Sequence, residues 1–244
     1  MTDFSANTTW LQQHGGSCQT TAPVAVAMCW LSIRGVNLML SQAYTWCRAT
    51  MRDQASGMPS LSAPTPYNVH RSMTEDGICL QALWSSFSGT PDAAANANAA
   101  THKVTIEEPA GDYVAAGIAA LNARCPFVGN GFYTDAWVGY SAASYAAGVV
   151  IPAATSTSQF IGGHDWQVVG HNPAKRAFLC CNGWPAYGFF WLAEDYFAPI
   201  AGMSQSWNGL WIIRDVGMGA AVPSTPLSTA QNACRVVGDY LNIP

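Results

Sequence analysis

Apolar positions are grouped near the start of the chain and alternate with polar positions in its second half. Residues 20–33, TTAPVAVAMCWLSI, are almost continuously apolar and rich in alanine, which predicts a buried helix that begins just after Cys18. Pro23 is expected in the first turn of this helix, where its missing N–H costs nothing. Apolar positions on one helical face, with Ser41 as N-cap, predict a second helix over 41–51.

Shorter helical patterns follow and then give way to strands. A third helix is predicted over 67–74, and the alanine- and asparagine-rich tract 91–100 is interpreted as a surface linker or a frayed helix without a function. Residues 113–123 predict a further helix. Short apolar runs separated by Gly and Pro indicate strands from there up to Arg214.

The change of pattern near residue 111 predicts an α+β chain with two differently built halves. We expect a single unit over 1–215, mainly helical over about 12–110 and β-rich over about 111–215. The tail over 216–244 is interpreted as a linker followed by a short helix. Residues from both halves can meet only in a cleft between them.

Two stretches of the second half predict a β-hairpin. HDWQVVG, residues 164–170, alternates as a strand does, and AFLCCN, residues 177–182, follows after a turn. In a symmetric antiparallel pairing His164 lies opposite Asn182, with their Cβ atoms about 4.5–5.5 Å apart on one face. Alternation sends Asp165 to the opposite face, so Asp165 is not favoured as a catalytic partner of His164.

A set of residues suited to thiol-nucleophile catalysis is spread along the chain. Gln12 precedes Cys18 by six residues, and His164 and Asn182 follow in that order. Such a cysteine attacks a carbonyl, the histidine takes its proton, the asparagine holds the histidine, and the glutamine stabilises the oxyanion. The N-terminus of the helix beside Cys18 favours its thiolate. Gln13 could replace Gln12 if the loop register differs by one residue.

The composition narrows the classes of partner. Only 10% of the 244 residues are charged, against roughly 25% in an average soluble domain, whereas 50% are hydrophobic. A net charge of −4 without a Lys/Arg cluster argues against nucleic acid, and no apolar run is long enough to predict a membrane span. No signal peptide is recognised, so the cytoplasm or export by a signal-independent route is expected. The scarcity of charge also fits a chain that lies against a protein partner or within a larger assembly.

The cysteines do not form a recognisable metal or disulfide pattern. Eight are present, none in a CxxC pair, and no His, Cys and carboxylate set has the spacing of metal ligands, so neither a metal nor another cofactor is expected. If Cys18 is a free nucleophile, an odd number remains. Most are interpreted as small buried apolar residues in a reducing compartment, although one or two disulfides remain compatible with the sequence.

In these residues the chain resembles the papain-like cysteine peptidases. Five motifs carry the resemblance in the order that the family has, and together they span most of the chain. They are Gln12–Cys18, similar to Q-x-x-x-x-x-C; Leu40-Ser41-Gln42, similar to the L-S-x-Q helix start; Asp76–Cys79 with Leu83-Trp84, similar to the G-G-I segment; Gly163–His171, similar to G-H-A-V-x-x-V-G-Y; and Asn182–Trp184 with Gly188–Leu192, similar to N-S-W-G and G-Y-F. Each motif is weak alone, but five in order are specific.

The resemblance implies a two-lobed papain-like fold. A helical lobe would carry the cysteine helix, and a β-barrel-like lobe would carry the histidine and the asparagine. It implies hydrolysis of a polypeptide substrate through an acyl-enzyme, with Cys18 as nucleophile, His164 as general base and then acid, and Asn182 as orienting residue. Gln12 and the Cys18 backbone N–H would form the oxyanion hole.

The resemblance also assigns roles to two flanking residues. Gly163 would border the substrate cleft, since paired glycines before His164 suggest a close backbone approach there. Trp184 would cover the His–Asn hydrogen bond from water. Neither His14 nor His171 is favoured as the base, because the first is expected in a loop and the second on the opposite strand face.

Four departures from the family pattern keep other functions open. Gln19 stands where the family has an aromatic residue, Gly183 and Pro185 replace a serine and a glycine, and Gly15 replaces a cysteine. No inhibitory propeptide of the usual length precedes the nucleophile. Two alternatives follow: an inactive papain-like protein that serves as a structural or binding component, and a papain-like amidase or transpeptidase.

Overall fold

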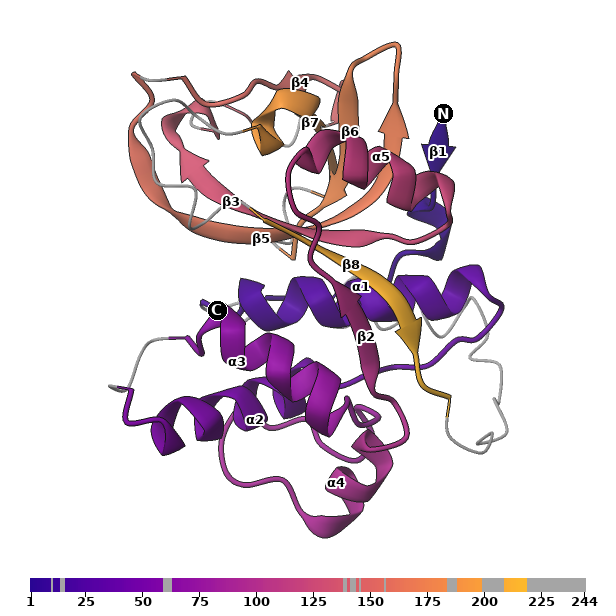
Figure 1. Ribbon diagram of the computed structural model, residues 1–244, viewed down its shortest axis with the longest axis vertical. Helices are drawn as coiled ribbons and strands as arrows, with labels where there is room; N and C mark the ends of the chain where they lie inside the picture. Colours follow the sequence, from indigo (N-terminus) through magenta and orange to yellow (C-terminus); the bar gives the residue numbers. More distant parts are fainter. Residues whose placement is uncertain are drawn as a thin grey trace.

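The computed structural model describes residues 1–9, 11–13, 16–58, 63–137, 140, 144, 146–155, 157–183, 188–198 and 209–218. The tail predicted as a linker and a short helix lies outside the described residues beyond Met218. The long helix α1 (Cys18–Ile33) runs through the middle of the molecule, with most other helices on one side of it and most of the sheet on the other (Figure 1). This arrangement confirms the predicted α+β fold.

Helix α1 is buried along nearly its whole length, as its apolar sequence predicts. All of its residues except Gln19 and Ser32 are buried. The helix begins at Cys18 rather than after it, because the Ser17 carbonyl already accepts hydrogen bonds from two N–H groups of the first turn. Pro23 is therefore the sixth residue of the helix, and its predicted place in the first turn is wrong. Without an N–H it leaves the Gln19 carbonyl without a helical donor, a cost that burial of the helix offsets.

The remaining helices start at polar caps that local sequence predicts. Ser41 caps α2 by accepting a hydrogen bond from Tyr44 N–H, and Asp92 caps α4 by accepting one from Ala95 N–H, so the tract interpreted as a linker or frayed helix is an ordered helix. A π-helical turn continues α3. The bounds are α2 (Gln42–Ala55), α3 (Pro66–Arg71) with its π turn (Ser72–Asp76), α4 (Ala93–Ala99) and α5 (Tyr113–Asn122).

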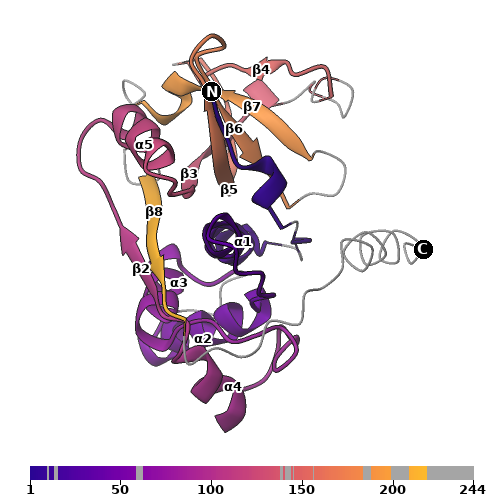
Figure 2. The ribbon, with the colours of Figure 1, turned by 90° about the vertical axis from the view of Figure 1, so that its right-hand side faces the viewer.

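One sheet contains all the described strands, and its order is β2-β8-β3-β5-β6-β7-β4, with β1 paired to β5. Every pair is antiparallel except β4 with β7. Figure 2 shows α1 end-on between this sheet and helices α2 and α3. The strands are β1 (Thr2–Asp3), β2 (Val104–Glu107), β3 (Phe127–Thr134), β4 (Val150–Ile151), β5 (Phe160–Asn172), β6 (Ala177–Cys181), β7 (Phe189–Ala193) and β8 (Gly209–Val216).

The hairpin of β5 and β6 has a different register from the symmetric one expected. Val168 pairs with Cys180, whereas symmetry would place it opposite Phe178. A bulge between Val168 and Gly170 shifts the pairing. On the side of the bulge toward His164, the observed pairs lie two residues away from the predicted register. An even shift keeps each side chain on its predicted face, because strand side chains alternate with a period of two.

Strand β2 is a feature that the sequence did not predict. It lies within the half expected to be helical, yet it pairs with β8 from the far end of the chain. The edge of the sheet is therefore built from both halves. Residues of α1 share a core cluster with Val104 of β2 and with Trp211 and Ile213 of β8.

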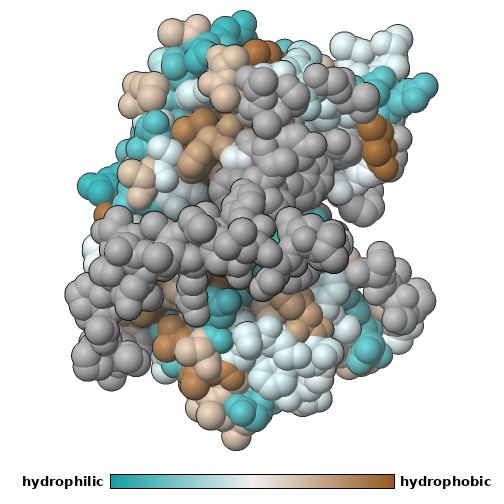
Figure 3. Space-filling view, turned by 180° about the vertical axis from the view of Figure 1, so that it is seen from behind, coloured by the Kyte–Doolittle hydropathy of each residue, from teal (hydrophilic) through white to brown (hydrophobic). Residues whose placement is uncertain are grey.

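In the coloured part of the face seen in Figure 3, apolar residues are not grouped into one broad patch. Brown and teal residues are interspersed over the coloured part of that face. Large apolar side chains exposed among the described residues are scattered along the chain: Met1, Met58, Tyr67, Leu83, Val149, Ile161 and Met218.

The cap of α2 offers a test of the local structure. Ser41 is buried, accepts from Tyr44 N–H and donates to the Trp84 carbonyl. We expect Ser41→Ala to lower the free energy of unfolding by roughly 1–2 kcal/mol, because a cap is lost and the partly buried Trp84 carbonyl loses its donor. Urea unfolding monitored by circular dichroism measures the change. Ser56→Ala at the exposed end of the same helix is the control; equal losses for both variants would contradict the role of the cap.

Candidate active site

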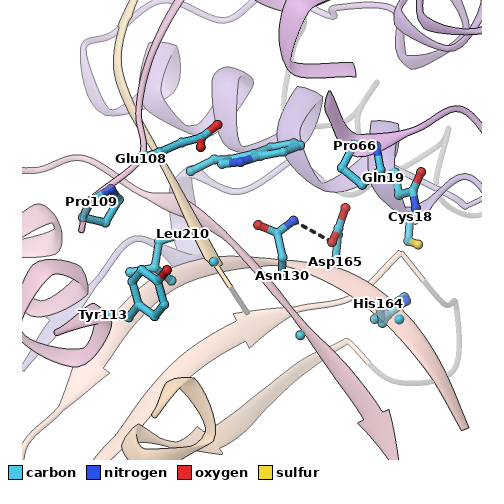
Figure 4. Close-up of a pocket in the computed structure, with 14 residues that line it drawn as sticks. Cys18, Gln19, Pro66, Glu108, Pro109, Tyr113, Asn130, His164, Asp165 and Leu210 are labelled. Atoms are coloured by element: carbon cyan, nitrogen blue, oxygen red, sulfur yellow. Dashed lines mark hydrogen bonds between the residues drawn. The ribbon is translucent and has the colours of Figure 1, made fainter. Parts of the chain in front are cut away.

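A cavity of about 320 Å³ lies between the N-terminus of α1 and the sheet (Figure 4). The nucleophile and the histidine proposed from the sequence both border it, although they are 146 residues apart in the chain. Its lining residues are Cys18, Gln19, Pro66, Glu108, Pro109, Tyr113, Asn130, Gly131, Gly163, His164, Asp165, Gly209, Leu210 and Trp211.

Cys18 occupies the first position of α1, where helix geometry favours a negative charge. The first N–H groups of a helix have no partner within the helix, and the macrodipole places about half a positive charge there. The first turn contains no acidic residue that would oppose this effect. The side chain is only 9% exposed, and its Sγ lies 3.9 Å from the Gly16 carbonyl oxygen.

His164 and Asn182 are joined by a hydrogen bond of 3.0 Å between Nε2 and Oδ1. Because Oδ1 is an amide oxygen and only accepts, Nε2 carries the proton and Nδ1 is the basic nitrogen. Both residues are buried. In the observed register they are diagonal rather than direct neighbours across the β5–β6 pair, which is still within reach of these side chains.

Trp166 packs against the imidazole of His164. It lies two residues after His164 on the same face of β5, and the two rings stack with centroids 5.6 Å apart and an interplanar angle of 29°. Trp166 is fully buried. The sequence predicts Trp166 as a core residue, and the structure confirms this. Its stacking on His164 follows from the strand, because residues i and i+2 of a strand lie on the same face.

Burial shifts the pKa values of the cysteine and the histidine in opposite directions. Burial raises the pKa of the Cys18 thiol to about 12, and the Asp165 carboxylate adds to this shift. Burial lowers the pKa of His164 to about 4, against the effect of its hydrogen bond to Asn182. Each group alone is thus pushed toward its neutral form. A thiolate–imidazolium pair is stable here only through the attraction between its two charges and the helix N-terminus.

Hydrogen bonds to their backbone groups hold Gln12 and Gln13, the two glutamines that precede Cys18. The Gln12 carbonyl accepts a hydrogen bond of 2.9 Å from Gln42 Nε2, and Gln13 N–H donates one of 3.0 Å to the Gly183 carbonyl. The Gln12 side chain is exposed, and neither glutamine is among the residues that line the cavity. The loop is therefore anchored to α2 on one side and to the segment after β6 on the other.

Gly183, one of the departures from the papain-like pattern, has a packing reason. A Cβ atom at this position would lie 3.0 Å from the Leu11 carbonyl oxygen and 3.1 Å from Gln13 Cβ. These contacts are tighter than ordinary van der Waals distances. The glycine lets the segment after β6 approach the loop before Cys18 closely.

Asp165 is part of the cavity wall, although strand alternation predicted that it lies on the opposite face of β5 from His164. It borders the same cavity as His164 and is 7% exposed. Gly131, the partner of His164 across the β3–β5 pair, and Gly163 line the same cavity. The Asp165 Oδ1 accepts a hydrogen bond of 2.7 Å from Asn130 Nδ2, and His164 Nε2 is bonded to Asn182.

Other residues considered for the site are separate from it or lie outside the described residues. His171 forms a partly buried contact of 2.7 Å between Nε2 and Glu194 Oε1. Trp184 and His14 are outside the described residues, so the covering role of Trp184 stays a prediction. Gly163 lines the cavity, and its role beside a bound substrate stays a prediction.

Within the described ranges, no three His, Cys, Asp or Glu side chains are grouped as metal ligands would be. Seven of the eight cysteines are described, and all seven are buried and unbridged. None of the described helices combines the length and the apolar character needed to cross a membrane.

No family model and no curated protein matches the sequence, but solved structures match the fold. Xylellain, a cysteine protease from Xylella fastidiosa, is 19% identical, with a TM-score of 0.69 over 87% of this chain and 84% of its own. Digestive procathepsin L 3 of Tenebrio molitor is 15% identical, with a TM-score of 0.63 over 86% and 68%. A cysteine protease of Carica candamarcensis in complex with E-64 is 18% identical, with a TM-score of 0.55 over 86% and 96%.

The matches extend over most of this chain, and each of these three structures is described as a cysteine protease or a procathepsin. They agree with the helix-and-sheet architecture of this chain. The chain therefore has the two-lobed α+β fold of the papain-like cysteine proteases.

Proposed function

We propose that this chain is a cysteine peptidase that hydrolyses peptide bonds through an acyl-enzyme. One observation carries the proposal: the hydrogen bond of 3.0 Å between His164 and Asn182 lies beside a cavity into which Cys18 faces from the start of α1. The bond sets the tautomer that a base needs. The cavity offers room for a substrate next to the thiol.

In the proposed mechanism His164 Nδ1 takes the proton of Cys18 as Sγ attacks the carbonyl carbon of the scissile bond. The negative oxygen of the tetrahedral intermediate accepts from the Cys18 backbone N–H and from the side chain of Gln12, whose backbone Gln42 holds in place. His164 then gives its proton to the leaving amine, and a thioester remains on Cys18. Water, deprotonated by His164, hydrolyses the thioester and restores the thiol.

Turnover of a labelled protein substrate such as casein, and of fluorogenic peptide amides, tests the proposal at neutral pH. We expect hydrolysis by the wild type and none above background by Cys18→Ser. Cys29→Ser is the matched control, because Cys29 is also buried and also has its pKa raised by burial to about 12. If Cys18→Ser retains the wild-type rate, or if the wild type cleaves no peptide or protein, the proposal is wrong.

Asn182→Ala should lower kcat by about 10- to 100-fold with little change in KM. The lost bond is one to a group that becomes positively charged during turnover, and such bonds contribute roughly 1.5–3 kcal/mol. Asn182 acts through the imidazole, so binding of the substrate is not expected to change. The pKa of His164 should also fall further, since the Asn182 bond raises it.

Steady-state kinetics of the purified variant measure this effect, with Asn122→Ala at the exposed end of α5 as a control. A loss confined to KM would mean that Asn182 contacts the substrate rather than orienting His164.

A further inference from the structure

The cavity beside Cys18 is rich in acceptors and holds no basic side chain apart from the histidine. Glu108 and Asp165 both line it, with the amides of Gln19 and Asn130, and none of its lining residues is Lys or Arg. A pocket of this composition favours a ligand group that donates hydrogen bonds and carries positive charge.

Asp165 has a buried carboxylate oxygen that such a ligand would pair with. It is 7% exposed, and Oδ1 accepts from Asn130 Nδ2 at 2.7 Å, but Oδ2 is buried without a hydrogen-bond partner among the described residues. Figure 4 shows the carboxylate rising from β5 into the cavity, between Asn130 and Cys18. A buried carboxylate oxygen without a donor is costly and rare in folded proteins.

Gln19, which also lines the cavity, favours the same kind of ligand. Its Oε1 is also buried without a partner among the described residues, and Gln19 follows Cys18 on α1. Two residues that line one cavity from different elements thus each have a buried acceptor oxygen without a partner among the described residues. Together they can receive several N–H donors from one group, as a guanidinium or an ammonium supplies.

The remaining walls suit the stem of a long cationic side chain. Pro66, Pro109, Tyr113, Leu210 and Trp211 line the cavity with apolar or aromatic surface. Methylene groups pack on such surface, and an aromatic face attracts a cation. At about 320 Å³ the cavity has space for one large side chain rather than for a folded ligand.

We propose that this cavity is a specificity pocket that binds an arginine or lysine side chain of the peptide substrate, with Asp165 as its charge partner and Gln19 as a second acceptor. The proposal rests on the proposed function in one respect, that the ligand approaching Cys18 is a peptide. Asp165 is a specificity-determining residue and takes no part in the proton transfers.

The electrostatics of the pocket agree with this assignment. Burial raises the pKa of Asp165 to about 7, against the Asn130 hydrogen bond. A bound cation stabilises the charged carboxylate and draws its pKa down again. Glu108 contributes negative charge at the rim, where its carboxylate is 60% exposed and lies 3.5 Å from His70.

Peptide binding by the Cys18→Ala protein tests the pocket without requiring turnover. Blocked tetrapeptides carry arginine, or its neutral near-isostere citrulline, at each position in turn, and calorimetry gives their dissociation constants. At one position arginine should bind about 10- to 100-fold more tightly than citrulline, since a charge-assisted bond is at stake. Asp165→Asn should reduce this ratio to about threefold or less.

Glu107→Gln is the matched control for the loss of one carboxylate. Glu107 pairs with Arg214 and does not line the cavity, so the arginine-to-citrulline ratio should remain at the value of the parent protein. If Asp165→Asn does not fold, Gln19→Met, which removes the second acceptor from a partly exposed position, should still lower the ratio about threefold. The proposal is overturned if no position prefers arginine, or if the preference survives the loss of both acceptors.

Turnover by the wild type separates this proposal from the proposed function. Cleavage without an arginine or lysine preference would overturn the pocket and leave the peptidase standing. Selective binding by the Cys18→Ala protein, combined with no cleavage by the wild type, would support the pocket and overturn the peptidase.

Discussion

His164→Ala should lower the rate at which an epoxide modifies Cys18 at pH 7 by at least about 1000-fold. Thiolate, not thiol, reacts, and each pKa unit changes the thiolate fraction tenfold. An activated cysteine has a pKa of roughly 7.5 or below. Without the imidazolium, burial and the Asp165 carboxylate leave the Cys18 thiol with a pKa near the value of about 12 that they impose on it. The difference exceeds three units.

Intact mass measured over time, followed by peptide mapping, gives the rate and the position of the modification. The wild type should gain one label, on Cys18. Cys29 is an internal reference in the same molecule, because burial also raises its pKa to about 12 and its Sγ lies 3.9 Å from Thr8 Oγ1. Cys29 should stay unmodified in both proteins.

Equal labelling of Cys18 in the wild type and in His164→Ala would show that the imidazole does not activate the thiol. Labels distributed over several cysteines would point to local opening instead of an activated site. Circular dichroism and urea unfolding of His164→Ala confirm that the comparison is between two folded proteins. A folded wild type whose Cys18 does not react would contradict the proposed mechanism.

The free energy of unfolding of Asp165→Asn, measured relative to that of the wild type, should increase by up to about 4 kcal/mol between pH 4 and pH 8. Burial raises the pKa of Asp165 from the ordinary value of 3.8 to about 7. Between these pH values the Asp165 carboxyl of the folded state binds more protons than that of the unfolded state. The stability that this group contributes is therefore fully present below pH 3.8 and is lost as pH rises to about 7. At about 1.4 kcal/mol per pKa unit, three units give the stated size.

Urea unfolding of both proteins at pH 4, 6 and 8 measures the effect as a difference between their unfolding free energies. His164 has its pKa lowered, so it contributes the opposite dependence, but it does so in both proteins and cancels in the difference. Glu107→Gln is the control. The Arg214 bond lowers the pKa of Glu107, so this variant should lose rather than gain relative stability as pH rises. A flat difference for Asp165→Asn would mean that water reaches the carboxylate.

The same measurement bears on the specificity pocket. A saturating arginine peptide should reduce the advantage of Asp165→Asn at pH 8, because the cation stabilises the carboxylate in the wild type only.

Local sequence determined the helices and the parts of the site. The apolar run of α1 and the Ser41 cap of α2 depend on neighbours within a few residues, so the helices lie close to where their patterns predict them. The order Gln12, Cys18, His164, Asn182 carried the resemblance to a fold that the structural matches confirm. The lobe boundaries and the catalytic roles stay predictions.

Tertiary structure decided the features that depend on residues distant in the chain. A bulge shifted the register of β5 and β6, and β2 found its partner in β8 about a hundred residues later, which no local periodicity encodes. Alternation along β5 predicted that Asp165 lies on the opposite face from His164, yet both residues border one cavity, because the extent of a cavity depends on what packs against the strand. The start of α1 and strand β5, far apart in the chain, both border this cavity, and so Asp165, which the sequence set aside, lines it together with Cys18.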